Sequence, residues 1–177
     1  MGFIFDRMAP EFKKAKLLQW NKVGPKKTVH LSDEYDIGTQ KVIVSGGLNL
    51  TEEVVSNDFP VDFNATDTIL AAEWVGLDFW GAIFLQFDPP VLAVGTNLAV
   101  IGSHDPVPFE GLIGAHWEDG STLNTKVPGA TSPGGKAIFL GASGRDKNRI
   151  QWLAIDAEEH NVPIKRIAIN QLSLVVS

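Results

Sequence analysis

The 177-residue chain contains no cysteine, which excludes disulfide bonds, thiolate metal sites and a cysteine nucleophile. No apolar run approaches the roughly 20 residues of a membrane-spanning helix. The apolar start of the chain is interrupted at once by Asp6 and Arg7, so we expect no signal peptide in the sequence as written. A phosphate-binding loop, a Gly-x-Ser-x-Gly turn and the dinucleotide-binding glycine pattern are all missing. The sequence therefore contains no complete catalytic motif.

Basic residues are scarce in the middle of the chain. Residues 31–120 carry fifteen acidic side chains and a single lysine, Lys41, whereas residues 1–30 carry seven basic and two acidic side chains. We therefore expect a basic N-terminal arm on an acidic body. With a formal net charge of −6 and a pI of about 5.1, the chain lacks the basic balance of a nucleic-acid-binding domain. Solvated faces explain most of these charges, and a site for a hard cation is the alternative for the acidic middle.

Hydrophobic residues make up 44% of the chain and charged residues 20%, which is enough to bury a core. Glycine and proline, with 17 and 10 copies, interrupt the sequence throughout and argue against a coiled coil. At this length we expect one domain over residues 1–177.

Short runs rich in Val, Ile, Phe and Trp, separated by Gly, Pro, Asn and Asp, predict an all-β fold with mostly antiparallel strands. We expect a β-sandwich of jelly-roll type, with a closed lipocalin-like barrel as the structural alternative. One helix is plausible, over residues 10–20, and an extended arm is the alternative there. The expected strands are residues 41–45, 68–73, 82–87, 98–101, 111–117, 137–141, 150–155 and 164–176.

Residues 111–119 alternate in polarity, which predicts a strand with one buried face. The sequence places Ile113, Ala115 and Trp117 on one face, and Leu112, Gly114, His116 and Glu118 on the other. The Asp119-Gly120 pair that follows predicts a hairpin turn. Residues 137–141 are apolar on both faces and predict a strand covered on both sides.

Three stretches in the second half of the chain occur in a characteristic order. The first stretch, residues 83–95, contains a strand that ends on phenylalanine, the turn Asp88-Pro89-Pro90 and the sequence Val-Leu-Ala-Val-Gly. The second, residues 114–123, contains a strand, an Asp-Gly hairpin and a return strand. The third consists of residues 139–142, Ile150 and, near the end of the chain, residues 167–174. Together they resemble a family of bacterial exported β-sandwich domains associated with PEP-CTERM proteins. The resemblance covers residues from about 80 to 177, and Asn170 stands where that family usually has aspartate.

The resemblance implies a surface or ligand-binding module in an extracellular, bacterial setting. Likeness of fold does not transfer function. Because no catalytic motif is complete, we expect a non-catalytic module that binds a carbohydrate or another small ligand. An enzyme and a structural or protein-interaction domain are the alternatives.

If the protein is an enzyme, His116 and Glu118 are the predicted catalytic residues. A histidine beside a carboxylate supplies a general base and the group that orients it, or two metal ligands. His104, Asp105 and Glu110 are the predicted partners of this pair. The polar face of an edge strand is the simpler interpretation, because no metal-binding motif is present.

Calcium is the candidate cofactor, and otherwise none is expected. Asp33, Glu34 and Asp36 crowd into one short stretch, and calcium binds six to eight oxygen ligands. A second stretch contains Asp58, Asp62 and Asp67. An acidic surface with turn-forming residues is the favoured interpretation, because no Asp-x-Asp-x-Asp-Gly loop is present.

Tryptophans beside acidic residues are the predicted ligand-binding residues. The first candidate is Trp80, which lies close to Asp78 and precedes a glycine, and Trp74 and Trp117 complete the set. Core packing is the alternative interpretation, and it is favoured for Trp117 and Trp152. A hydrophobic lumen that holds a small apolar ligand would use the same residues.

Overall fold

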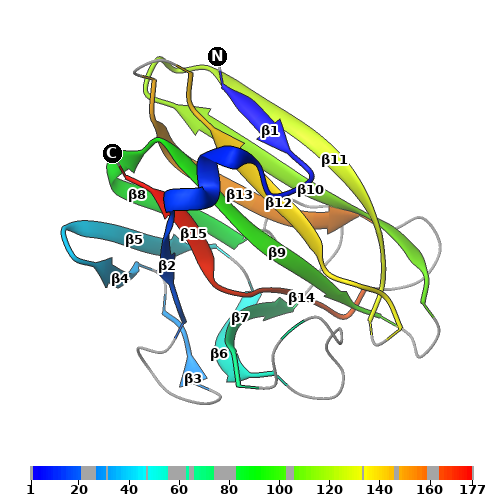
Figure 1. Ribbon diagram of the computed structural model, residues 1–177. Coiled ribbons are helices and arrows are strands. Elements are labelled where there is room, and N and C mark those ends of the chain that lie inside the picture. The colour runs from blue at the N-terminus through cyan, green and yellow to red at the C-terminus, as the bar shows by residue number, and fades with distance from the viewer. Residues whose placement is uncertain are drawn as a thin grey trace.

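The computed structural model describes residues 2–20, 27–30, 32–46, 48–55, 63, 66–73, 83–102, 106–132, 134–145, 148–158 and 164–176. Two antiparallel sheets pack face to face, and neither closes into a barrel (Figure 1). The predicted β-sandwich is therefore confirmed, and the barrel alternative is wrong.

The smaller sheet has six strands in the order β11-β10-β13-β8-β5-β4. The bounds of these strands in chain order are β4 Asp33–Ile37, β5 Gln40–Ser45, β8 Ile83–Val91, β10 Pro108–Trp117, β11 Thr122–Ala130 and β13 Ile150–Glu158. Its middle strands β10, β13 and β8 alternate strictly between buried and more exposed residues over most of their length. One face of this sheet therefore closes the core, and the other faces outward.

The larger sheet has nine strands, seven of them in the order β1-β12-β9-β14-β7-β6-β3, with β15 pairing both β9 and β2. From β8 onward the chain changes sheet at most connections, and the jelly-roll type stays a prediction. The bounds in this sheet are β1 Phe3–Phe5, β2 Lys16–Leu18, β3 Lys27–Thr28, β6 Leu48–Val54, β7 Thr68–Glu73, β9 Ala93–Ile101, β12 Ile138–Ser143, β14 Arg166–Ile169 and β15 Leu172–Val175.

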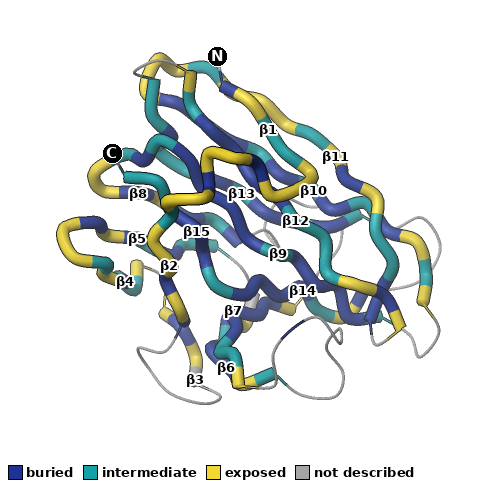
Figure 2. The backbone as a smooth tube through the Cα atoms, viewed as in Figure 1, coloured by how far each residue is buried: buried dark blue, intermediate teal, exposed yellow. Residues whose placement is uncertain are grey.

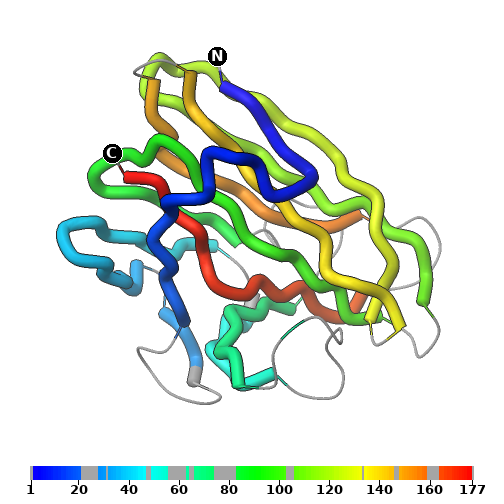
Figure 3. Tube along the Cα trace, viewed as in Figure 1, coloured from blue at the N-terminus to red at the C-terminus, as the bar shows by residue number. Residues whose placement is uncertain are grey.

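The N-terminal segment crosses the outer face of the larger sheet. Instead of the predicted helix over residues 10–20, the chain forms a five-residue 3₁₀ turn, Pro10–Lys14, followed by β2. Phe12 on this turn packs edge-to-face against Phe139 at 5.5 Å between ring centroids. This contact covers the outer side of β12 and explains why residues 137–141 are apolar on both faces. Figure 3 shows the N-terminal segment beside β15 and β9.

No helix among the described residues is long and apolar enough to cross a membrane.

The strands that the sequence analysis missed include both edges of the smaller sheet. β11 buries only Val127, and β4 buries only Tyr35, as the exposed stretches in Figure 2 show. An edge strand needs only one paired side, so it tolerates the Pro128 and Gly129 of β11 and the acidic residues of β4. Such strands lack the apolar alternation by which the central strands were recognised.

Polar groups buried in the core connect the N-terminal region to the sandwich. The Trp20 Nε1–H donates to the carbonyl oxygen of Asn170 at 2.5 Å, and the Trp20 ring meets that of Tyr35 edge-to-face at 5.0 Å. The Tyr35 hydroxyl in turn donates to Glu52 Oε1 at 2.5 Å. Burial, and then the bond to the Glu52 carboxylate, raise the pKa of Tyr35 far above its ordinary value. The phenol therefore stays a hydrogen-bond donor at any physiological pH.

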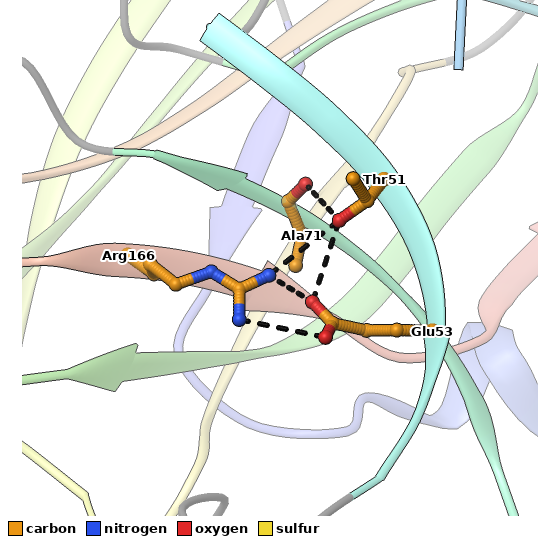
Figure 4. Close-up of polar contacts among 4 residues, drawn as sticks. All are labelled: Thr51, Glu53, Ala71 and Arg166. Atoms are coloured by element: carbon orange, nitrogen blue, oxygen red, sulfur yellow. Dashed lines mark hydrogen bonds and ion pairs between the residues drawn. The ribbon is translucent and has the colours of Figure 1, made fainter. Parts of the chain in front are cut away.

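An ion pair on the outer face of the larger sheet joins β6 to β14 across β7. The Arg166 guanidinium contacts both carboxylate oxygens of Glu53, and Thr51 lies against the same pair (Figure 4). The Glu53 side chain is only 8% exposed, and that of Arg166 is 31% exposed. Removing the cation would therefore leave a nearly buried carboxylate without its partner.

We expect Arg166→Met to lower the free energy of unfolding by about 2–3 kcal/mol, somewhat less than for a fully buried pair, because Glu53 would be left unpaired. The double variant Arg166→Met/Glu53→Leu should recover most of this loss. Urea unfolding with an unchanged m-value would measure both. Equal stability of Arg166→Met and the wild type would show that the ion pair contributes nothing.

Candidate ligand-binding groove

The outward face of the six-stranded sheet follows from the period of its strands. From Trp152 onward, β13 alternates between partly exposed and buried residues, and the partly exposed ones are Trp152, Ala154, Asp156 and Glu158. On β10 they are Glu110, Leu112, Gly114 and His116. This confirms the predicted alternation of residues 111–117. Because side chains at paired positions share a face, the strand register decides which of these residues lie side by side.

The smallest outward residues fall in one row across the sheet. Gly114 pairs with Ala154, and Ala154 pairs with Phe84 of β8. The neighbouring row contains His116 paired with Trp152, and the row on the other side contains Leu112 paired with Asp156. A line of small side chains between two lines of large ones makes a hollow, with Gly114 and Ala154 as its floor.

This hollow is a groove of about 460 Å³ over β11, β10, β13 and β8. The volume lies in the usual range for small-molecule sites. Its lining is mostly apolar, with polar side chains on β11 and at Asp156. The outward-facing residues that line it are Phe84, Leu112, Gly114, Thr122, Asn124, Lys126, Trp152, Ala154 and Asp156.

Gly114 is required for the shape of the floor. A Cβ atom at this position would lie 2.6 Å from Oδ1 of Asn124 on β11. The glycine thus allows the Asn124 amide to lie over β10, at the side of the groove.

Trp152 is the central aromatic residue of this face. Its ring stacks on the His116 ring, with centroids 5.1 Å apart and planes 6° apart, and it is tilted against Phe84. A second hollow of about 250 Å³, lined by Ser45, Phe84, Gln86 and Trp152, adjoins the groove. Phe84 and Trp152 line both hollows, so the two lie side by side on this face.

Among the described residues that line the groove, Asp156 is the one with a carboxyl group. Burial raises its pKa to about 6, against the lowering effect of a hydrogen bond from the Ala157 backbone N–H at 2.8 Å. Within the part of the chain that the structure describes, Asp156 has no ion pair. The nearest cation along the sheet, Lys126, lies 3.1 Å from Glu110 and contacts Glu158. Asp156 is thus a partly desolvated carboxylate that forms an ion pair with no basic side chain of the described residues.

Among the described residues of the predicted catalytic site, His116 and Glu118 make no direct polar contact with each other. Glu118 lies in the exposed turn after β10. Nδ1 of His116 is buried without a hydrogen-bond partner. Glu110 is bound to Lys126, and His104 and Asp105 lie outside the described residues.

The acidic stretch that suggested calcium is strand β4, where successive side chains point to opposite faces. Asp33 accepts a hydrogen bond from the His30 backbone N–H, while Glu34 forms an ion pair with Lys41 at 2.9 Å. Asp36 lies on the same outward face as Lys41. The described residues contain no group of three or more acidic or histidine side chains that could hold a metal ion. Of the second stretch, Asp58 and Asp62 lie outside the described residues.

The structure places Trp117 in the core and Trp152 at the groove, whereas the prediction listed Trp117 among the ligand-binding residues and favoured the core for Trp152. Trp117 is fully buried, and its Nε1–H donates to the Ser143 carbonyl, so its ring is inaccessible to a surface ligand. Trp74, Trp80 and Asp78 lie outside the described residues. Trp152, which the sequence analysis assigned to the core, is half-buried at the groove instead.

Sequence reasoning therefore missed Trp152, Phe84, Asn124 and Asp156. The signal was present, because the alternation of residues 150–158 assigns Trp152 and Asp156 to the face opposite Leu153 and Ile155. Applying the period-two argument to residues 152–158 would have placed both Trp152 and Asp156 on the outward face.

No protein-family model matches the chain, and no curated protein matches it significantly. The resemblance to exported β-sandwich domains stays a prediction.

We expect Gly114→Ala to change the stability by no more than about 1 kcal/mol, because the new methyl group meets only the movable end of Asn124. The control is Gly111→Ala on the same strand, where the methyl group would lie 2.5 Å from Ile138 in the core. Overpacking there should cost about 1–3 kcal/mol. Thermal unfolding of both variants tests the assignment, and equal losses would contradict an open groove over Gly114.

Stability should also depend on the ionisation of Asp156. The folded-state pKa of about 6 lies above the ordinary value of 3.8, so the folded protein binds the proton more tightly than the unfolded chain. The free energy of unfolding therefore falls as the pH rises from about 3.8 to about 6 and stays at its lower value above that range. We expect Asp156→Asn to stabilise the protein by about 1 kcal/mol near pH 8 and by almost nothing near pH 4. Thermal unfolding at the two pH values measures this, and an equal effect at both would contradict it.

Proposed function

We propose that the outward face of the six-stranded sheet binds a carbohydrate, with the sugar chain lying in the groove over Gly114 and Ala154. The observation that carries this proposal is the half-buried Trp152 beside an apolar floor, with hydrogen-bonding side chains around it. The protein is then a binding module without catalytic activity.

An aromatic ring beside the floor suits the apolar side of a sugar. The face of an aromatic ring is electron-rich, so it attracts the weakly positive C–H groups of a pyranose. His116 covers one face of the Trp152 ring, and Phe84 stands at a tilt beside it. The ring is therefore held in place before a ligand arrives, and little rotamer entropy is lost on binding.

Polar groups around the floor suit the hydroxyl groups of a sugar. Asn124 and Thr122 lie on β11, and Gln86 lies on the other side of Trp152. Amide and hydroxyl side chains both donate and accept hydrogen bonds, as sugar hydroxyls do. A ligand that was only apolar would leave these groups unpaired, which favours a carbohydrate over a lipid-like molecule.

The length of the groove favours an oligosaccharide over a single sugar. The row that contains its floor runs across the strands from Asn124 on β11, through Gly114, Ala154 and Phe84, to Ser45 on β5. Four strand spacings make this path about 19 Å long. The groove and its neighbouring hollow together thus offer room for several linked rings.

We expect Trp152→Ala to weaken oligosaccharide binding at least about tenfold, because it removes the stacking ring. The matched control is Leu17→Ala, which removes a large exposed apolar side chain from the other sheet. Isothermal titration with neutral β-1,4-linked hexasaccharides measures both. Binding that is weakened equally by the two variants, or by neither, would contradict the proposal.

The same mixtures test for catalysis. Chromatography of the sugars after long incubation should recover the intact hexasaccharide. Shorter fragments would instead establish a hydrolase, with Asp156 as its first candidate acid because its raised pKa suits proton donation.

A further inference from the structure

We propose that the groove selects oligosaccharides that carry free amino groups, with the Asp156 carboxylate binding an ammonium group of the sugar chain. This inference rests on the proposed function and names the class of sugar that the groove prefers.

The charge of the outward face favours a cationic ligand. Its described strand positions carry six carboxylates and two lysines, a balance of −4; they are Glu34, Asp36, Asp88, Glu110, Asp156, Glu158, Lys41 and Lys126. A face with this balance repels sugars that carry carboxylate or sulfate groups. It accepts neutral sugars and attracts those with ammonium groups.

On this face, Asp156 is the carboxylate best placed to bind a ligand cation, because the two lysines contact other acidic residues. Lys126 contacts Glu110 and Glu158, and Lys41 contacts Glu34. Asp156 lies in the lining of the groove, and its one hydrogen bond comes from the Ala157 backbone N–H. It therefore has room for a further donor, and an ammonium ion provides the strongest kind, a charge-assisted one.

Partial burial makes this carboxylate a better anchor than the exposed acids. Burial raises the pKa of Asp156 because it removes water from the charged form. A ligand ammonium restores the lost stabilisation, whereas an exposed carboxylate is already solvated. The other outward titratable side chains on the strands of the groove are Glu110 and His116 on β10, Lys126 on β11, Glu158 on β13 and Asp88 on β8.

The spacing along β13 connects this anchor to the stacking residue. Trp152 and Asp156 are four residues apart on the same face, with Ala154 between them. Four residues of a strand span about 13 Å. A sugar ring beside Trp152 thus cannot itself reach Asp156, so the amino group belongs to a different ring of the same chain.

The test uses three hexasaccharides with the same β-1,4-linked backbone that differ only at C2: a cello-oligosaccharide with hydroxyl groups, an N-acetylglucosamine oligomer and a glucosamine oligomer. Isothermal titration is carried out at about pH 7 and low ionic strength, where the Asp156 carboxylate is mostly ionised. We expect the wild type to bind the glucosamine oligomer about tenfold more tightly than the other two.

Asp156→Asn should abolish that preference, so that the glucosamine oligomer binds no more tightly than the cello-oligosaccharide. The matched control is Asp36→Asn, which makes the same change on the same face at the edge strand β4. It should keep most of the preference, because its carboxylate lies outside the groove lining.

The outcomes separate the inference from the proposed function. Equal binding of all three oligomers, or a preference that survives in Asp156→Asn, overturns the amino-sugar inference while carbohydrate binding stands. A preference that is lost equally in Asp156→Asn and Asp36→Asn also overturns the inference, because the total charge of the face, and not Asp156 itself, would then attract the amino sugar. Failure of all three oligomers to bind contradicts the proposed function itself.

Discussion

Burial of alternate side chains between the two sheets is the constraint on which the rest of the structure depends. In β10 and β13, Ile113, Trp117 and Leu153 must point inward to fill the core, so their neighbours must point outward. A shift of β13 by one residue would reverse its two faces and bury Asp156. The groove thus depends on the core for its register.

The central strands and the sandwich itself could be predicted, because alternation and turn residues are local signals. The hairpin at Asp119-Gly120 is an example, since Gly120 adopts φ +80° between β10 and β11. The edge strands β4 and β11 could not be predicted in this way. These two strands lack the apolar alternation of the central strands. They are extended because they form backbone hydrogen bonds with a neighbouring strand, and the local sequence does not show that pairing.

The candidate site was predictable only in part for the same reason. The pattern of residues 111–117 places His116 outward, but it does not reveal that Trp152 stacks on it, because that pairing depends on the register of β10 with β13. Local sequence likewise suggested that Asp33, Glu34 and Asp36 converge, whereas a strand separates them onto two faces. The proposed sugar site is therefore a product of strand pairing, which aligns Gly114 of β10 with Ala154 of β13 in one row.

The most direct test of this account is ¹⁹F NMR of the protein labelled with 5-fluorotryptophan, titrated with a β-1,4-linked hexasaccharide. The chain has five tryptophans, and the Trp152 signal can be assigned from the spectrum of Trp152→Phe. The account predicts that the Trp152 resonance shifts progressively with ligand while those of the buried Trp20 and Trp117 stay in place. A Trp152 signal that remains fixed while another tryptophan responds, or no response at all, would contradict it.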